Sequence, residues 1–159
     1  MLTVRVIVAA ILVVVGSVFS VRGQGDDLLK TLGAVDQKQR PQLARRLRLF
    51  MDHQRNSRWD ELYKLIDKVN ADHWRGKDFA TMMVKFGHID FVPEHSKADD
   101  DHGLQYRVYG CVKVGREGKP IWFRGGLVAY LQEGDWYFTP YFLQYDRLGS
   151  PLRCTDAVR

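Results

Sequence analysis

The sequence is poor in the residues that mark several specialised classes of protein. It has two cysteines among 159 residues, too few for a disulfide-dense scaffold, and no Cys/His spacing predicts a zinc module. It has 5 prolines and 14 glycines with no repeat, which excludes a collagen-like or low-complexity chain. With 45% hydrophobic and 27% charged residues, the chain has the composition and length of one globular domain that folds without a metal or cofactor.

Long apolar runs are absent except near the N-terminus, where Val6 to Val15 is uninterrupted. Arg5 precedes this run and small residues follow it, a pattern typical of a cleaved secretory signal peptide. Extended to Val21 the run has 16 residues, whereas a membrane-spanning helix needs about 20. We therefore expect residues 1–23 to be cleaved and the protein to be secreted or periplasmic, with no stable membrane span. An uncleaved N-terminal membrane anchor is the alternative.

The positive charge of the chain is partly a property of this leader. Cleavage would remove Arg5 and Arg22 and no acidic residue, which lowers the formal net charge from +5 by two, to +3. So modest a charge does not indicate a nucleic-acid partner, and export argues against one.

After the leader, the sequence predicts an N-terminal arm over residues 24–40, one α+β domain over 41–147 and a C-terminal tail over 148–159. The domain begins with helical spacing. Leu43, Leu47 and Phe50 recur at i, i+4 and i+7, with Pro41 in the first turn. A second amphipathic stripe begins at Trp59, which we expect Ser57 to cap, and a third short helix is expected over residues 78–84.

The apolar period changes to two after Phe86, which predicts a first short strand that ends at Pro93. Three longer strands are expected over residues 104–114, 121–131 and 136–146. The short turns between them imply an antiparallel meander.

Alignment of the apolar faces of these strands predicts their register. It places Leu131 opposite Trp136 and Ala129 opposite Phe138. The same alignment places Gly125 opposite both Phe142 and Gly110, and Phe123 opposite Val112. Glycines gathered across neighbouring strands predict a bent sheet or a bulge, and a bent sheet over helices leaves a concave face.

Helices followed by a curved antiparallel sheet resemble the nuclear transport factor 2-like (cystatin-like cone) superfamily. The resemblance rests on the helix segment Trp59-Asp60-Glu61-Leu62-Tyr63 and on the final hairpin, Glu133-Gly134-Asp135-Trp136-Tyr137-Phe138. It covers residues 41–146 and implies three helices packed on a cone-shaped sheet. The superfamily includes ligand-binding proteins, isomerases, dehydratases, hydrolases and transport adaptors, many of them dimers through the sheet, so the fold does not select a function.

The leading functional hypothesis is a non-catalytic binding or assembly module for an apolar small molecule, with no cofactor. The ligand would lie between helices and sheet, against side chains that are apolar or aromatic: Trp59, Tyr63, Phe79, Tyr106, Phe123 and Phe138. The rival hypothesis is a small cavity enzyme, an isomerase, dehydratase or hydrolase, with His88 and Asp90 as its acid–base pair. These two residues lie two apart on one strand and so share a face.

The face of the sheet turned away from the helices is unusually aromatic, which favours an interface and a homodimer. The interface residues predicted there are Tyr109, Trp122, Tyr130, Tyr137 and Tyr141. Cys111 lies on the same face. The tail that carries Cys154 is long enough to reach Cys111, so the two could form a disulfide in an oxidising compartment. Two separate thiols are the alternative.

One connection is rich in metal-ligand residue types: His95, Asp99, Asp100, Asp101 and His102. It lacks the glycine and terminal glutamate of a calcium loop, so we interpret it as a solvated hairpin loop and predict no metal site.

Overall fold

The computed structural model describes residues 22–73, 76–115 and 120–144. The first helix, α1 (Arg22–Thr31), begins at the end of the predicted leader and continues into the predicted N-terminal arm, so it overlaps the predicted cleavage site. Leu28, Leu32 and Val35 on and after α1 are buried, and the helix packs beside strand β1 (His88–Ala98). The Oγ of Ser96 donates to the carbonyl of Thr31 at 3.0 Å. The arm is thus an ordered helix joined to the domain core. The cleavage itself stays a prediction, since residues 1–21 lie outside the described part.

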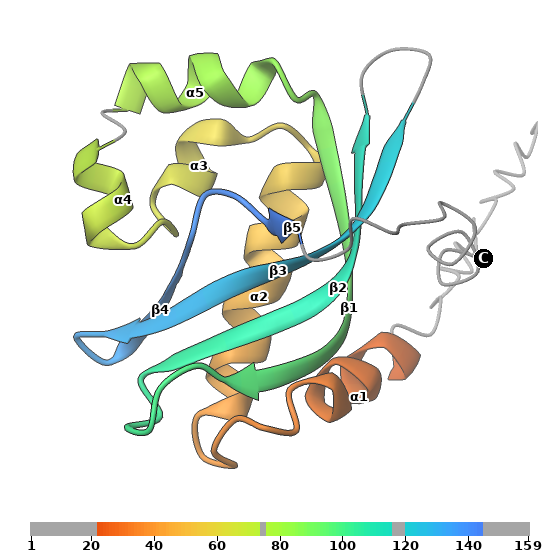
Figure 1. Cartoon of the computed structure of the whole chain (residues 1–159), viewed down its shortest axis with the longest axis vertical. Coiled ribbons are helices and arrows are strands. Elements are labelled where there is room, and N and C mark those ends of the chain that lie inside the picture. Colours follow the sequence, from red (N-terminus) through yellow and green to blue (C-terminus); the bar gives the residue numbers. More distant parts are fainter. Residues whose placement is uncertain (1–21, 74–75, 116–119, 145–159) are drawn as a thin grey trace, which may run out of the picture.

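The long helix α2 (Arg40–Arg55) is the centre of the fold, with Pro41 in its first turn as predicted. It crosses the sheet diagonally because both of its ends are tied to strands. At its start, the Nε2 of Gln42 donates to the carbonyl of Gly134 at 2.9 Å. At its end, the Nε of Arg55 lies 2.6 Å from the Oδ1 of Asp90. In Figure 1, strands β2 and β3 pass in front of α2.

Three short helices follow: α3 (Trp59–Tyr63), α4 (Lys68–His73) and α5 (Gly76–Val84). The sequence did not predict α4. The predicted cap at Ser57 is wrong, because Ser57 adopts a left-handed backbone with φ of 54° and Arg58 stands at the N-cap without a side-chain cap. Figure 1 shows α4 and α5 at one end of the molecule and α1 at the other.

The sheet has the order β1-β2-β3-β4, all antiparallel, with β2 (Gln105–Gly115), β3 (Ile121–Gln132) and β4 (Asp135–Phe138). The predicted meander and α+β class are confirmed. A two-residue turn joins β3 to β4, in which Glu133 and Gly134 both have positive φ, as a type I′ turn requires. Beyond β4, a parallel bridge pairs Phe138 with Ile66.

Most of the predicted register is confirmed, including Gly110 opposite Gly125 and Phe123 opposite Val112. The pairs Leu131–Trp136 and Ala129–Phe138 are also present. The pair Gly125–Phe142 is wrong. The last predicted strand is interrupted after Phe138 and resumes as β5 (Leu143–Gln144), so Gly125 faces Gln144 instead. The interruption moves the pairing by two residues, and therefore the alternation of faces is kept.

The expectation that Pro93 ends the first strand is also wrong. Strand β1 continues to Ala98 because its register shifts between Pro93 and His95, opposite Gly110. A Cβ atom at Gly110 would lie 2.1 Å from the carbonyl oxygen of Val92, so only glycine allows this approach. The predicted bulge at the glycine cluster is therefore confirmed, on β1.

Candidate functional site

The concave face of the sheet carries a gradient of burial from its middle to one end. In the middle, Val108, Val112, Leu127 and Phe138 are fully buried beneath the helices. Toward the end of the sheet where β2 finishes and β3 begins, the inward-facing side chains become half-buried. We call this region the open end of the concave face and define it by three residues: Val114, Phe123 and Phe142.

Aromatic rings line the path from the open end to the core. The ring of Phe142 lies 4.8 Å from that of Phe91 and 6.5 Å from that of Phe50, between centroids. Phe50 in turn lies 4.8 Å from Phe138. Offset and tilted rings at these separations attract one another beyond simple burial. The open end is thus an extension of the core that reaches solvent.

Gly125 makes room between the two half-buried aromatic residues. A Cβ atom there would lie 3.0 Å from the ring of Phe123 and 3.2 Å from the Cβ of Phe142. Both contacts are tighter than ordinary van der Waals distance, so a larger residue would displace one of the rings. The glycine therefore shapes the open end.

Gln54 places an amide in these apolar surroundings. It lies one turn beyond Phe50 on the same stripe of α2 as Leu43 and Leu47, and its exposed fraction is 0%. Neither its Nε2 nor its Oε1 has a hydrogen-bond partner among the residues that the structure describes. A buried donor or acceptor left without a partner costs about 1–3 kcal/mol, so this position is expensive unless something bonds to the amide.

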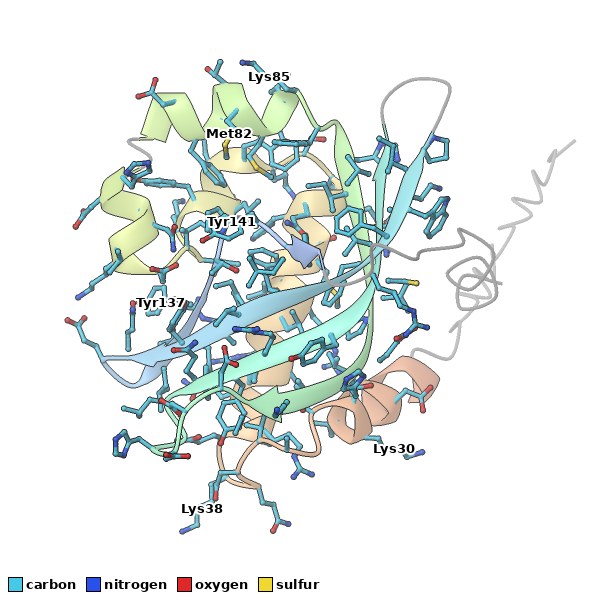
Figure 2. All side chains as sticks on the ribbon, viewed as in Figure 1. Lys30, Lys38, Met82, Lys85, Tyr137 and Tyr141 are labelled. Atoms are coloured by element: carbon cyan, nitrogen blue, oxygen red, sulfur yellow. The ribbon has the colours of Figure 1, made fainter. Side chains whose placement is uncertain are left out.

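Helices α3 and α5 form the wall next to α2. The ring of Tyr63 lies 5.5 Å from that of Phe79, and its hydroxyl donates to the carbonyl of Ala71 at 2.6 Å. Met82 is half-buried on α5, and Figure 2 shows it on the side of α5 that faces α3. A flexible thioether on such a wall suits irregular apolar shapes.

The six predicted ligand-binding residues divide into two groups. Phe79 and Phe138 are fully buried, and Tyr106 and Trp59 are 5% and 8% exposed, so these four belong to the closed core. Tyr63 and Phe123 are half-buried and accessible. Of the six, Phe123 belongs to the open end, whereas Tyr63 packs against Phe79 on the helical wall.

The two predicted acid–base residues lie away from the concave face. Ile89 and Phe91 are the buried residues of this part of β1, so His88 and Asp90 between them point to the other side. His88 is exposed and stands opposite Gly115, and the carboxylate of Asp90 is paired with Arg55. This placement gives no support to the hypothesis of an acid–base pair in a cavity.

Four of the predicted interface residues, Tyr109, Trp122, Tyr130 and Tyr137, lie at strand positions that face away from the helices, whereas Tyr141 lies between β4 and β5. These four are half-buried and Tyr141 is 48% exposed. Tyr137 and Tyr141 are labelled in Figure 2, beside β4 and on the segment that follows it. Further contacts extend this surface: His95 stacks on Tyr109 with centroids 4.8 Å apart, and the Nζ of Lys113 lies 5.2 Å from the ring centre of Trp122.

Burial raises the pKa of Tyr130 on this face above its ordinary value of 10.0, and the carboxylate of Asp67 raises it further. Both effects disfavour the phenolate, the first by removing water and the second by repulsion. The hydroxyl of Tyr130 therefore stays neutral at physiological pH.

The predicted disulfide falls partly outside the described residues, which exclude Cys154. Cys111 is fully buried on β2, opposite Arg124 of β3.

The connection between β1 and β2 is the one rich in aspartate. In it, Asp99 pairs with Arg107, and the Oδ1 of Asp100 accepts a hydrogen bond from the backbone N–H of Leu104 at 3.1 Å. These contacts are those of a hairpin loop. Within the described part of the chain, no three metal-ligating side chains come together.

Sequence reasoning missed Gln54 and the role of Phe142. The signal for Gln54 was present, since it continues the series Leu43, Leu47 and Phe50 by one more helical turn. A polar residue at the end of an apolar stripe normally indicates that the helix becomes exposed to solvent at that position. For Phe142 the alternation predicted the inward face but the wrong cross-strand partner, because the interruption after Phe138 is not visible in the sequence pattern.

Solved structures share this architecture at low sequence identity. A protein of Bdellovibrio bacteriovorus, Bd1075, is 11% identical with a TM-score of 0.51, over 69% of this chain and 42% of its own. An NTF-2 like protein of unknown function from Shewanella oneidensis is 11% identical with a TM-score of 0.47, over 62% of this chain and 92% of its own. An LEH-like epoxide hydrolase of M. tuberculosis is 15% identical with a TM-score of 0.45, over 72% of this chain and 85% of its own.

The likeness to Bd1075 shows that the two chains share a fold, and the α+β class with an antiparallel sheet that the resemblance implied is present. No protein-family model and no curated protein matches the sequence. In the described residues, no helix is long and apolar enough to cross a membrane. At these identities the likeness concerns the fold alone.

Proposed function

We propose that this protein is a non-catalytic binding module that holds an apolar small molecule at the open end of the concave face. One observation carries the proposal. Val114, Phe123 and Phe142 face inward, continue the core and remain half-buried. Apolar surface that extends a core and still reaches water gains free energy when a ligand covers it, at roughly 25 cal/mol per Å².

The surroundings support an apolar ligand over a charged one. The polar side chains that are buried in the described residues are Gln54, Asp67 and Thr139. None is a cation, and both carboxylate oxygens of Asp67 accept hydrogen bonds from Asn70. An anionic ligand would therefore lose its hydration without a partner of opposite charge.

A first experiment identifies the natural ligand. Native mass spectrometry of the protein purified from its source is expected to detect a bound small molecule that organic solvent extracts. A second experiment measures affinity for naphthalene by its fluorescence. Saturable binding of naphthalene to the full chain is expected. Absence of both results would refute the proposed function.

A pair of variants locates the binding to the open end. Phe123→Ala is expected to weaken naphthalene binding on the order of tenfold, because about 1.5 kcal/mol of apolar contact is removed. Tyr109→Ala is the matched control, since it removes a ring from the outer face of the neighbouring strand. Equal weakening in both variants would place the binding elsewhere.

A further inference from the structure

We infer that the Gln54 amide is the polar anchor of the ligand, so that the preferred ligands are uncharged apolar molecules with one group that both donates and accepts hydrogen bonds. A carboxamide is the simplest such group. The inference rests on the proposed function and names the class of molecule that the open end selects.

The position of Gln54 is the first argument. Gln54 lies one turn from Phe50 on the buried stripe of α2. An apolar side chain at this position would bury no polar atoms and would therefore avoid the free-energy cost of desolvating them. Phe50 contacts Phe142, which belongs to the open end. The neighbouring residue Arg55 is tied to Asp90, and Asp90 stands opposite Lys113, next to Val114. The end of α2 that carries Gln54 is therefore the end beside the open end of the concave face.

The state of the amide is the second argument. Its exposed fraction is 0%, and both its donor and its acceptor atoms lack hydrogen-bond partners in the described residues. A primary amide offers two N–H donors and one carbonyl acceptor, which match the complementary groups of a carboxamide in a paired arrangement. A ligand with only one of these functions would leave part of the amide unpaired, and a hydrocarbon would leave all of it unpaired.

The third argument is that none of the buried polar side chains in the described residues, Gln54, Asp67 and Thr139, is a cation. It distinguishes a carboxamide from the carboxylate of the same shape. A carboxylate would bring a charge next to the Gln54 carbonyl oxygen, and the Gln54 amide alone does not compensate the loss of its hydration. The site is therefore expected to reject the anion.

Three probes with one ring system test this order of preference: 2-naphthamide, naphthalene and 2-naphthoate. We expect the full chain to bind 2-naphthamide about tenfold more tightly than naphthalene, and 2-naphthoate more weakly than either. In Gln54→Met the preference for 2-naphthamide over naphthalene is expected to disappear. Gln42→Met makes the same change at the other end of α2 and should keep the preference.

The outcomes separate the inference from the proposed function. Binding of naphthalene without a preference for 2-naphthamide would overturn the anchor and leave the proposed function standing, with ordered water as the partner of the amide. No saturable binding of any probe would overturn both. Persistence of the preference in Gln54→Met would also overturn the anchor.

A measurement on the unaltered chain covers the case in which Gln54→Met does not fold. With glutamine labelled by nitrogen-15, the side-chain amide resonance of Gln54 is expected to shift when 2-naphthamide is added. Naphthalene at equal saturation should shift it much less. Equal shifts with both probes would overturn the anchor, because they would report contact without a hydrogen bond.

Discussion

The Nη2 of Arg46 on α2 lies 2.5 Å from the Oδ2 of Asp135 at the first residue of β4, and its guanidinium stands 5.5 Å from the ring centre of Tyr137. This relationship joins the long helix to the edge of the sheet. The Arg46 side chain is 18% exposed, so the pair is shielded more than a surface ion pair. Together with Gln42, it fixes where α2 begins to cross the sheet.

The first prediction concerns this junction. Arg46→Met is expected to lower the free energy of unfolding by about 1–2 kcal/mol, because it removes a partly buried ion pair and a cation–π contact. Urea denaturation measures the change. Arg45→Met, at the exposed neighbouring position, serves as the control and should change the free energy of unfolding little. Equal losses would show that the junction contributes no specific stability.

The second prediction concerns the bulge in β1. Gly110→Ala is expected to cost about 3 kcal/mol or more, because the added methyl group would meet the backbone of Val92. Gly115→Ala on the same strand is the matched control. Its methyl group would meet the ring of His88, an exposed side chain that can turn away. Thermal unfolding measures the stability of both variants. Equal losses of stability in the two would contradict the close approach at Gly110.

The third prediction is a pH dependence. The pKa of Tyr130 is raised in the folded state, so the folded chain keeps a proton that the unfolded chain loses at high pH. Its contribution to stability is therefore fully present below about pH 10 and declines as the pH rises above that value. Urea denaturation is expected to show a decline above about pH 10 that is smaller in Tyr130→Phe. An identical decline in both proteins would contradict the assignment.

The fourth prediction is the bridge between Cys111 and Cys154. Mass spectrometry of protein alkylated without reductant is expected to find one intramolecular disulfide and no modified cysteine. The bridge would close a loop of about 43 residues, and Cys154→Ser is expected to lose roughly 4 kcal/mol in the chain-entropy model. Two alkylated thiols in protein from an oxidising compartment would exclude the bridge.

The fifth prediction is association through the outer face. If Tyr109 and Trp122 lie in an interface, the chain without residues 1–23 should sediment as a dimer, and Trp122→Ser should shift it toward monomer. Leu49→Ser, at a 41% exposed apolar position on α2, is the control and should leave the dimer intact. A stable monomer at high concentration would exclude this homodimer.

Alternation in the sequence determined most of the sheet. Side chains two apart share a face, so the apolar sets around Val112 and Leu127 determined the register of β2 with β3, and those around Leu131 and Trp136 determined that of β3 with β4. The helical stripe of α2 followed from Leu43, Leu47 and Phe50 in the same way. These are local regularities, and each can be read without knowledge of the neighbouring element.

Only the tertiary structure decided the site. Whether Phe79 or Phe123 reaches solvent depends on which helix covers which part of the sheet, and no periodicity carries that information. The interruption after Phe138 brings Phe142 onto Phe91, and the diagonal course of α2 buries Gln54, because contacts at both ends of the helix set its crossing. Burial is a property of packing between distant segments, whereas alternation is a property of the strand itself.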